Sequence, residues 1–323
     1  MVCAARRNGG GSSPGRPARG RPGAARLQLD MQPVFKRHRG NPILTAEDMP
    51  ISAQAVLNPG VTEQDGEVVL LLRVENAGGY SSIHVARSDD GVSNWRIGSE
   101  PLLAYGQPGL RYEQWGCEDA RVVRFEEQSC WYITYPAYSP AGAAVGLART
   151  CDLSEAERVG LIFSPSNKDA ALFPRKIGGR YAVLHRPDAG GGIENIWVAF
   201  SEDLFYWGEP HVVLEEGAGP AWDAVTVGTG PPPIETEQGW LLIYHGVKMH
   251  GSQRIYRVGA ALLDIDDPHK VRARTASNIF KPTEDYEFTG LMPNVVFPTG
   301  TLLRGDELWM YYGAADTSVC LAT

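Results

Sequence analysis

The chain has 323 residues, 43% of them hydrophobic, which is enough to bury one large core or two ordinary ones. The formal net charge is -8, and the first thirty residues hold six arginines and one acid, so residues 31–323 carry about -13. A body this acidic repels phosphate backbones, which excludes nucleic acid as a partner.

The first thirty residues are mostly Gly, Pro, Ala and Arg, and we expect residues 1–30 to be a disordered extension, with Met31 as an alternative start. No stretch approaches the roughly 18 apolar residues of a membrane span, so no membrane partner is expected. The cysteines are odd in number and lack a C-x-x-C pair, which fits neither a disulfide framework nor a zinc site. A reducing cytoplasm is therefore the predicted location.

A repeat of about 60 residues runs through the rest of the chain. The segments HVARSDDG, GLARTCDL, WVAFSEDL, GAALLDID and CLAT each contain an alanine, and an apolar run rich in β-formers precedes each of them. Five such units predict an all-β chain, a five-bladed β-propeller over residues 31–323. The repeated alanines are Ala86, Ala148, Ala199, Ala261 and Ala322.

Two details qualify this architecture. Helical turns are expected only near residues 151–159 and 264–270. The last unit stops at Thr323 without an outer strand, so we expect the segment after Met31 to close the ring and a short C-terminal tail to be missing.

Polar residues end each apolar run, and a propeller brings equivalent positions of its blades to one central funnel. Such a funnel suits a polyhydroxylated ligand. Strand ends also meet water in many proteins, which is the simpler explanation for any single residue. The polar residues are Arg73 with Glu75, Tyr135, His185 with Arg186, Tyr244 with His245, and Tyr312 with Asp316.

The segment GCEDARVVRF (residues 116–125) places three charges before an apolar strand. In an extended chain Asp119 and Arg121 share one face and Glu118 takes the other, so one carboxylate should enter the funnel. A structural ion pair between Asp119 and Arg121 is the alternative. Trp115, beside these charges, either stacks on a sugar or belongs to the core.

Many motifs in a fixed order, from residue 41 to 323, resemble glycoside hydrolase family 130, the β-mannoside phosphorylases and related hydrolases. They include NPIL (41–44), LNPG (57–60), RVE (73–75), EDAR (118–121), NKDAALFP (167–174), LHRP (184–187), GTGPPPIETEQGWLLIYHGV (228–247), YRVGAALLD (256–264), NVVFPTG (294–300) and YYGAADT (311–317).

The resemblance implies a role for each matching residue. Asp119 matches the general acid, while Asn58, Arg73 and Asp316 match residues that hold the mannose. Tyr244 is expected to join them in binding substrate because it ends one apolar run. Lys168, Arg186 and His245 match the phosphate pocket.

The implied reaction is inverting phosphorolysis of β-mannosides to α-mannose 1-phosphate, with phosphate as co-substrate and no cofactor or metal. One acid then suffices, because phosphate replaces the base and water of a hydrolase. The departures from the family pattern are Ala120 in place of a proline, and Thr226 and Val227 where many phosphorylases have a basic residue.

Two other functions stay open. The first is an inverting hydrolase with Glu287 as its base, and the second is a non-catalytic sugar-binding propeller. The linkage, the acceptor sugar and homo-oligomer formation also stay open.

Overall fold

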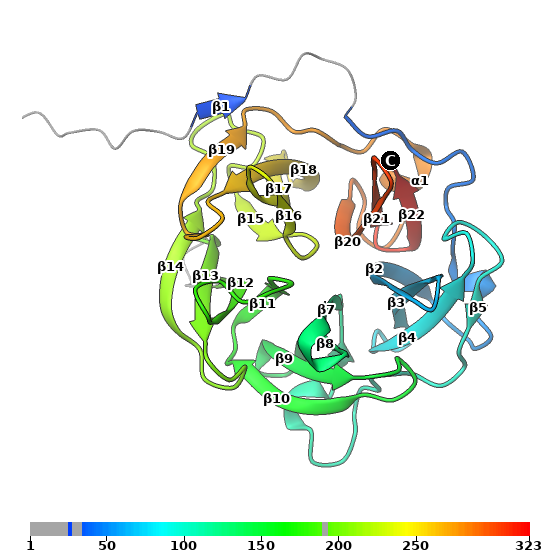
Figure 1. The fold of residues 1–323 in the computed structure, drawn as a ribbon. Coiled ribbons are helices and arrows are strands. Elements are labelled where there is room, and N and C mark those ends of the chain that lie inside the picture. Colours follow the sequence, from blue (N-terminus) through cyan, green and yellow to red (C-terminus); the bar gives the residue numbers. More distant parts are fainter. Residues whose placement is uncertain (1–24, 28–33, 189–192) are drawn as a thin grey trace, which may run out of the picture.

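The computed structural model describes residues 25–27, 34–188 and 193–323, and most of the predicted N-terminal extension lies outside these ranges. Its strands form four hydrogen-bonded sheets around a central axis, and the largest sheet contains two blades joined through a short strand. The predicted five-bladed propeller is confirmed, because the structure matches those of five-bladed propellers (Figure 1). The innermost strands of blades 1 to 5 are β2 (Ala55–Gln64), β7 (Arg121–Phe125), β11 (Asn167–Leu172), β15 (Thr226–Thr229) and β20 (Val296–Arg304).

The second and third strands of each blade carry the repeat seen in the sequence. The second strands are β3 (Glu67–Glu75), β8 (Cys130–Ser139), β12 (Tyr181–Pro187), β17 (Gly239–His250) and β21 (Glu307–Ala314). The third are β4 (Ser81–Ser88), β9 (Gly142–Thr150), β13 (Ile196–Ser201), β18 (Gln253–Leu263) and β22 (Ser318–Ala322). The five repeated alanines lie on these third strands and are all buried, because a small side chain lets neighbouring blades approach closely.

The outer strands complete the blades. They are β5 (Arg96–Ile97), β10 (Glu157–Phe163), β14 (Gly208–Leu214) and β19 (Val271–Thr275). β1 (Ala25–Leu27) adds to β19, β16 (Ile234–Thr236) to β17, and β6 (Gly116–Cys117) joins β4 of blade 1 to β8 of blade 2.

The N-terminal segment closes the ring, as predicted. Residues 36–44 run beside β22, and Lys36 and Thr323 exchange backbone hydrogen bonds of 2.6 and 2.9 Å. Core cluster residues Leu44, Val56 and Tyr311 bring this segment together with blades 1 and 5. Blade 5 therefore takes its outer edge from the start of the chain.

Helices are few in the described ranges, and the two predicted helical segments are wrong. Residues 151–156 form turns that lead into β10, and residues 264–270 form a turn in which Asp264 accepts two backbone N–H groups. The helices are α1 (Asp285–Phe288) and the 3₁₀ turns Ala46–Asp48, Arg111–Glu113 and Glu126–Gln128. No helix of the described residues is long and apolar enough to cross a membrane.

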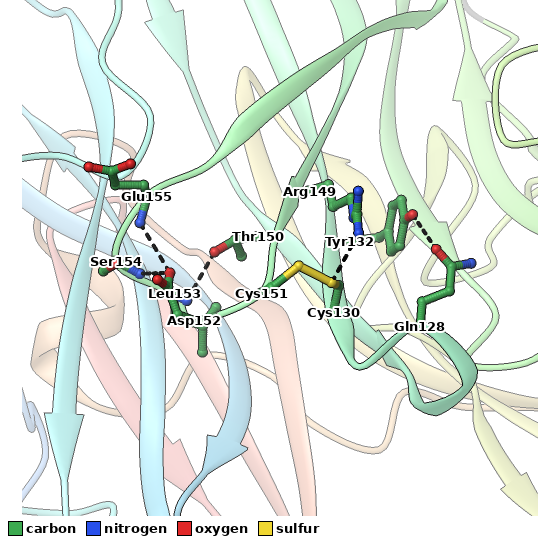
Figure 2. The surroundings of a disulfide bond; sticks show 10 residues. All are labelled: Gln128, Cys130, Tyr132, Arg149, Thr150, Cys151, Asp152, Leu153, Ser154 and Glu155. Atoms are coloured by element: carbon green, nitrogen blue, oxygen red, sulfur yellow. Dashed lines mark hydrogen bonds between the residues drawn. A yellow bond between two sulfur atoms is a disulfide. The ribbon is translucent and has the colours of Figure 1, made fainter.

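A disulfide joins Cys130 to Cys151, so the expectation of free thiols is wrong (Figure 2). Strands β8 and β9 pair Trp131 with Thr150, and the next residues out along this register are the two cysteines, whose Cα atoms lie 4.1 Å apart. Their sequence spacing does not reveal this pairing. Cys117 and Cys320 are free and buried, and Cys3 lies outside the described residues.

One end of the ring collects the polar residues. Because adjacent strands are antiparallel, three features share this end: the starts of the innermost strands, the hairpins from second to third strands, and the connections between blades. We call this end the funnel face.

Candidate active site

Asp119 lies on the funnel face two residues before β7, and the residue is 7% exposed. Asn58 Nδ2 donates to Asp119 Oδ1 at 2.8 Å, and Arg73 Nη1 donates to the same oxygen at 3.2 Å. Asn58 comes from blade 1, so the acid is fixed across a blade boundary. The residues predicted for acid and sugar binding therefore meet at one place.

The predicted separation of Glu118 and Asp119 onto opposite faces is wrong. Arg73 Nη2 lies 3.1 Å from Glu118 Oε1, so both neighbouring carboxylates reach one guanidinium. The backbone at Asp119 has a φ of 35°, in the left-handed region, and a chain bent in this way does not alternate its side chains as a strand does.

The two carboxyl groups have opposite pKa shifts. Burial opposes ionisation of Asp119, but Arg73, Arg121 and the Asn58 hydrogen bond outweigh it and lower its pKa. Burial raises the pKa of Glu118, and the Asp119 charge adds to this against the attraction of Arg73. Asp119 is therefore ionised near neutral pH.

Asp316 completes the acidic side of the funnel. It follows β21 in the hairpin to β22, with a φ of 51°. Burial raises its pKa to about 6, the Arg73 charge opposes this, and the Asp119 charge adds to it. Asp316 and Asp119 are close enough for each to feel the other's charge.

Arg121 does not form the predicted ion pair with the Asp119 carboxylate. Its Nη1 donates to the Asp119 backbone oxygen at 2.7 Å, and its Nη2 lies 3.4 Å from Asp169 Oδ1. Arg121 is buried and fixes the backbone bend at Asp119, and its charge lowers the pKa of the Asp119 carboxyl group without a direct ion pair.

A cavity of about 290 Å³ lies on the same face and contains all three residues predicted to bind phosphate. It is lined by Tyr138, Gly142, Ala143, Ser166, Asn167, Lys168, Arg186, Asp188, Glu194, Thr226, His245, Arg254, Tyr256 and Phe297. Another cavity, of about 470 Å³, lies by Ile43 and Trp95 and holds none of the predicted site residues.

Within this cavity the cations differ in how they are held. Arg186 Nε lies 2.8 Å from Asp169 Oδ2, and Arg186 Nη1 pairs with Glu194. By contrast, the side chains of Lys168 and Arg254 have no hydrogen bond or ion pair within the described ranges. The cavity therefore presents one braced guanidinium and two cations available to an anion.

His245 enters the cavity as a neutral imidazole. Burial lowers its pKa to about 3, despite the Asp169 carboxylate 3.6 Å from its Nε2. Its Nδ1 is buried and finds no hydrogen-bond partner among the described residues. This free ring nitrogen is suited to a bound ligand.

Other predicted funnel residues point elsewhere. Tyr244 is fully buried, and its hydroxyl lies 3.1 Å from Asp223 and 2.9 Å from Arg274, which argues against direct contact with a sugar. Tyr135 donates to Glu113 at 2.6 Å and Tyr312 to Glu287 at 2.9 Å. At each of these strand ends the tyrosine side chain points between the blades and not into the funnel.

Glu287 is unsuited to act as a base. It is 0% exposed, lies 2.8 Å from Arg37, and accepts from the Thr283 and Glu284 backbone N–H groups at 2.7 and 3.1 Å. With the Tyr312 hydroxyl as well, its oxygens are occupied by structural partners. The proposed Glu287 base is therefore wrong.

Sequence reasoning missed three residues that shape the site: Asp169, Glu194 and Arg254. Asp169 is 1% exposed, and burial opposes its charge, but the guanidinium groups of Arg186 and Arg121 lower its pKa. Asp169 directly follows Lys168 in the sequence, so its position next to a predicted site residue could have identified it. Arg254 lies across the β17–β18 register from Met249, and no sequence pattern places that hairpin over the cavity.

No group of three or more His, Cys, Asp or Glu side chains in the described part of the chain could hold a metal ion. Fold and site together define a β-propeller with an acidic subsite beside a cationic cavity on its axial face, an arrangement suited to a sugar and an anion.

Comparisons with known proteins identify the family of this chain. A family model described as beta-1,4-mannooligosaccharide phosphorylase matches residues 28–323, and the chain belongs to this family, glycoside hydrolase family 130. The chain is 41% identical to the beta-1,2-mannobiose phosphorylase of Listeria innocua over 74% of its length and 65% of that enzyme, slightly under two thirds. It is 33% identical to the beta-1,4-mannooligosaccharide phosphorylase of Ruminococcus albus over 91% of its length and 89% of that enzyme.

Solved structures give the same fold. The Listeria innocua enzyme in complex with beta-1,2-mannobiose superimposes with a TM-score of 0.81 at 34% identity, covering 90% of this chain and 96% of that one. A family member from work on hydrolases that target beta-1,2 mannosidic linkages has a TM-score of 0.80 at 24% identity, covering 92% and 95%.

Proposed function

We propose that the chain is an inverting β-mannoside phosphorylase that releases α-mannose 1-phosphate. The observation that carries this proposal is the pairing of Asp119, fixed by Asn58 and Arg73, with a cavity in which Lys168 and Arg254 form no direct ion pair among the described residues. The curated relatives, which are named as phosphorylases of β-1,2- and β-1,4-linked mannosides, support the same reaction.

In the proposed reaction the acidic subsite holds the non-reducing mannose. Asn58, Arg73 and Asp316 offer amide, guanidinium and carboxylate groups to its hydroxyls. Tyr244 has no direct part in this subsite, because its hydroxyl is bound to Asp223 and Arg274 in blade 4. A sugar bound here excludes water from the acid.

Phosphate would occupy the cationic cavity. Lys168 and Arg254 supply charge, Arg186 supplies a guanidinium already oriented by Asp169 and Glu194, and His245 supplies a neutral ring nitrogen. Thr226, which the sequence analysis noted as uncharged, lines this cavity. Arg254 lines the same cavity and provides a cation there.

The bond changes follow from these positions. A phosphate oxygen attacks the anomeric carbon, the bond from that carbon to the leaving oxygen breaks, and this oxygen takes a proton that Asp119 supplies through a sugar hydroxyl. The lowered pKa of Asp119 opposes proton donation. Bound phosphate brings negative charge to the funnel, which favours the protonated form of Asp119. The proton that hydrogen phosphate loses when it forms the ester replaces the one that Asp119 passes to the leaving oxygen, so the step balances.

The test is a product assay on β-1,2- and β-1,4-linked mannobiose with and without inorganic phosphate. Phosphorolysis predicts mannose 1-phosphate only when phosphate is present. Equal turnover without phosphate, yielding free mannose, would instead establish hydrolysis. Binding without any turnover would establish a non-catalytic sugar-binding protein. A cytoplasmic location, the domain limits 1–30 and 31–323, and the lack of any cofactor besides phosphate remain predictions.

A further inference from the structure

The two halves of the Cys130–Cys151 disulfide differ in exposure. Cys130 is 3% exposed and lies inside blade 2, where it pairs with Phe125 of β7. Cys151 is exposed and follows β9, in a turn where the Asp152 carboxylate accepts the Ser154 N–H. A thiol in solution therefore reaches Cys151 and not Cys130.

A cavity of about 440 Å³ lies beside Cys151, at the end of the ring opposite the funnel face. Glu63 and Asp65 of the β2–β3 hairpin line it together with Arg124 of β7. Arg124 Nη1 lies 3.7 Å from the exposed Glu126, which is too far for a hydrogen bond, so this guanidinium keeps donors for a ligand. Carboxylates and a guanidinium in one wall suit a small zwitterion with an ammonium and a carboxylate group.

Arg149 lies beside the buried sulfur. Its Nη2 donates to Cys130 Sγ at 3.3 Å (Figure 2). Its Nε is buried and has no hydrogen-bond partner in the part of the chain that the structure describes. A nearby cation stabilises a thiolate and makes that sulfur a better leaving group. The disulfide should therefore break with its electron pair on Cys130.

We propose that this disulfide is a thiol-exchange site, where a small zwitterionic thiol such as cysteine or glutathione forms a mixed disulfide with Cys151. The incoming thiolate sulfur bonds to Cys151 Sγ, and the bond between Cys151 and Cys130 breaks. Cys130 Sγ leaves with the electron pair as a thiolate beside Arg149. One disulfide replaces another, so the step needs no reactant besides the attacking thiolate.

The exchange site is separate from the proposed active site and does not rest on the proposed function. The disulfide joins the start of β8 to the turn after β9, whereas Asp119 lies on the funnel face, at the other end of these strands. Opening the bond releases the turn at residues 151–156 from β8 and leaves the contacts of Asp119 in place. The cysteine pair thus makes the stability of the protein respond to thiols in its surroundings.

The test is incubation of the folded protein with excess cysteine, glutathione or uncharged mercaptoethanol, followed by acid quenching, alkylation and peptide mass spectrometry. We expect the mixed disulfide on Cys151 about tenfold more often than on Cys130, and an opening rate proportional to the thiol concentration. The buried thiols of Cys117 and Cys320 should stay unmodified.

Three variants separate the two roles of the charged groups. Arg149→Met should slow opening by all three thiols about tenfold, because the Cys130 thiolate loses its cation. Arg124→Met should slow opening by cysteine and glutathione but not by mercaptoethanol, which has no carboxylate. Arg175→Met is the matched control, because Arg175 pairs with Glu235 on the surface, away from the disulfide.

A mixed disulfide found equally on both cysteines, or mostly on Cys130, would overturn the proposal. So would an opening rate that does not depend on thiol concentration, or modification of Cys117 and Cys320 at the same rate, since unfolding would then limit access to the bond. An unchanged rate in folded Arg149→Met would reject Cys130 as the leaving sulfur. Thermal unfolding shows whether each variant is folded, and the concentration dependence in the unaltered chain needs no variant.

Discussion

Arg37 and Glu287 are joined by two hydrogen bonds of 2.8 Å, although 250 residues separate them in the chain. The pair links the segment that closes the ring to α1, and Tyr312 of blade 5 donates to the same carboxylate. The Glu287 carboxylate, which the sequence analysis gave as the base of a possible hydrolase, therefore helps to close the ring.

Glu287→Gln should therefore destabilise the protein without a specific loss of catalysis. Removing one partner of a buried ion pair costs about 3–5 kcal/mol, because the other charge is left uncompensated. Thermal unfolding should show a lower Tm, and turnover measured well below that Tm should stay within a few fold. Arg37→Met should lower the Tm similarly. Complete loss of activity in a folded Glu287→Gln protein would restore the hydrolytic base.

Asp119→Asn should reduce turnover by about 10²–10⁴-fold, the usual contribution of a positioned acid. The amide keeps the hydrogen-bonding shape beside Asn58 and Arg73 but cannot supply a proton. Steady-state kinetics should show the loss in kcat, and calorimetry should show retained mannoside binding. Glu118→Gln is the matched control, because it changes the neighbouring carboxyl group that also pairs with Arg73. A larger loss in Glu118→Gln would move the acid role to Glu118.

Asp316→Asn should stabilise the protein near pH 7.5 and not near pH 4. The folded pKa of about 6 lies above the ordinary 3.8, so the carboxyl group favours folding below pH 4 and this contribution is lost as pH rises through 6. At pH 7.5 the gain in unfolding free energy should be about 1–3 kcal/mol. Unfolding at the two pH values checks this.

The same substitution should raise KM for the mannoside, since the proposed role of Asp316 is to hold sugar hydroxyls. An unchanged KM would remove Asp316 from the proposed sugar subsite. An equal Tm change at both pH values would show that its charge does not control stability.

Arg254→Ala should raise KM for phosphate about tenfold and leave KM for the mannoside nearly unchanged, because one of the two cavity cations without a direct ion pair in the described residues is lost. Initial rates at varied phosphate check this. Arg180→Ala provides a control, since Arg180 forms a surface ion pair with Glu209 outside the cavity. An unchanged phosphate KM would leave Lys168 as the sole free cation of the proposed phosphate site.

Reduction of the Cys130–Cys151 disulfide should lower stability while leaving the active site intact. The bond spans 21 residues, and the chain-entropy relation gives about 3 kcal/mol for a loop of this size. Thermal unfolding with a reductant should show a Tm lower by about 5 °C or more. Cys151→Ser should show the same Tm with and without reductant. The bond lies at the start of β8 and just after the end of β9, which is the end of the ring opposite the funnel face, and Figure 2 shows its surroundings.

The sequence by itself determined the repeat and the family. Apolar runs and small buried residues recur in each unit, because every blade packs against its neighbours in the same way. The repeat in the sequence therefore aligns Ala86 with Ala322 without any structure. The motifs EDAR and NKDAALFP led to the prediction of Asp119 and Lys168 as site residues, because each lies within a short segment whose residue types can be recognised without its neighbours in space.

The tertiary structure alone decided which side chains meet. The left-handed backbone at Asp119 turned Glu118 toward Arg73, and the alternation of strand residues sent Tyr244 between blades. The β17–β18 hairpin brought Arg254 to the cavity, and the β8–β9 register paired Cys130 with Cys151. Contacts between residues this far apart depend on backbone direction and sheet register, and a linear pattern of residue types encodes neither of these directly.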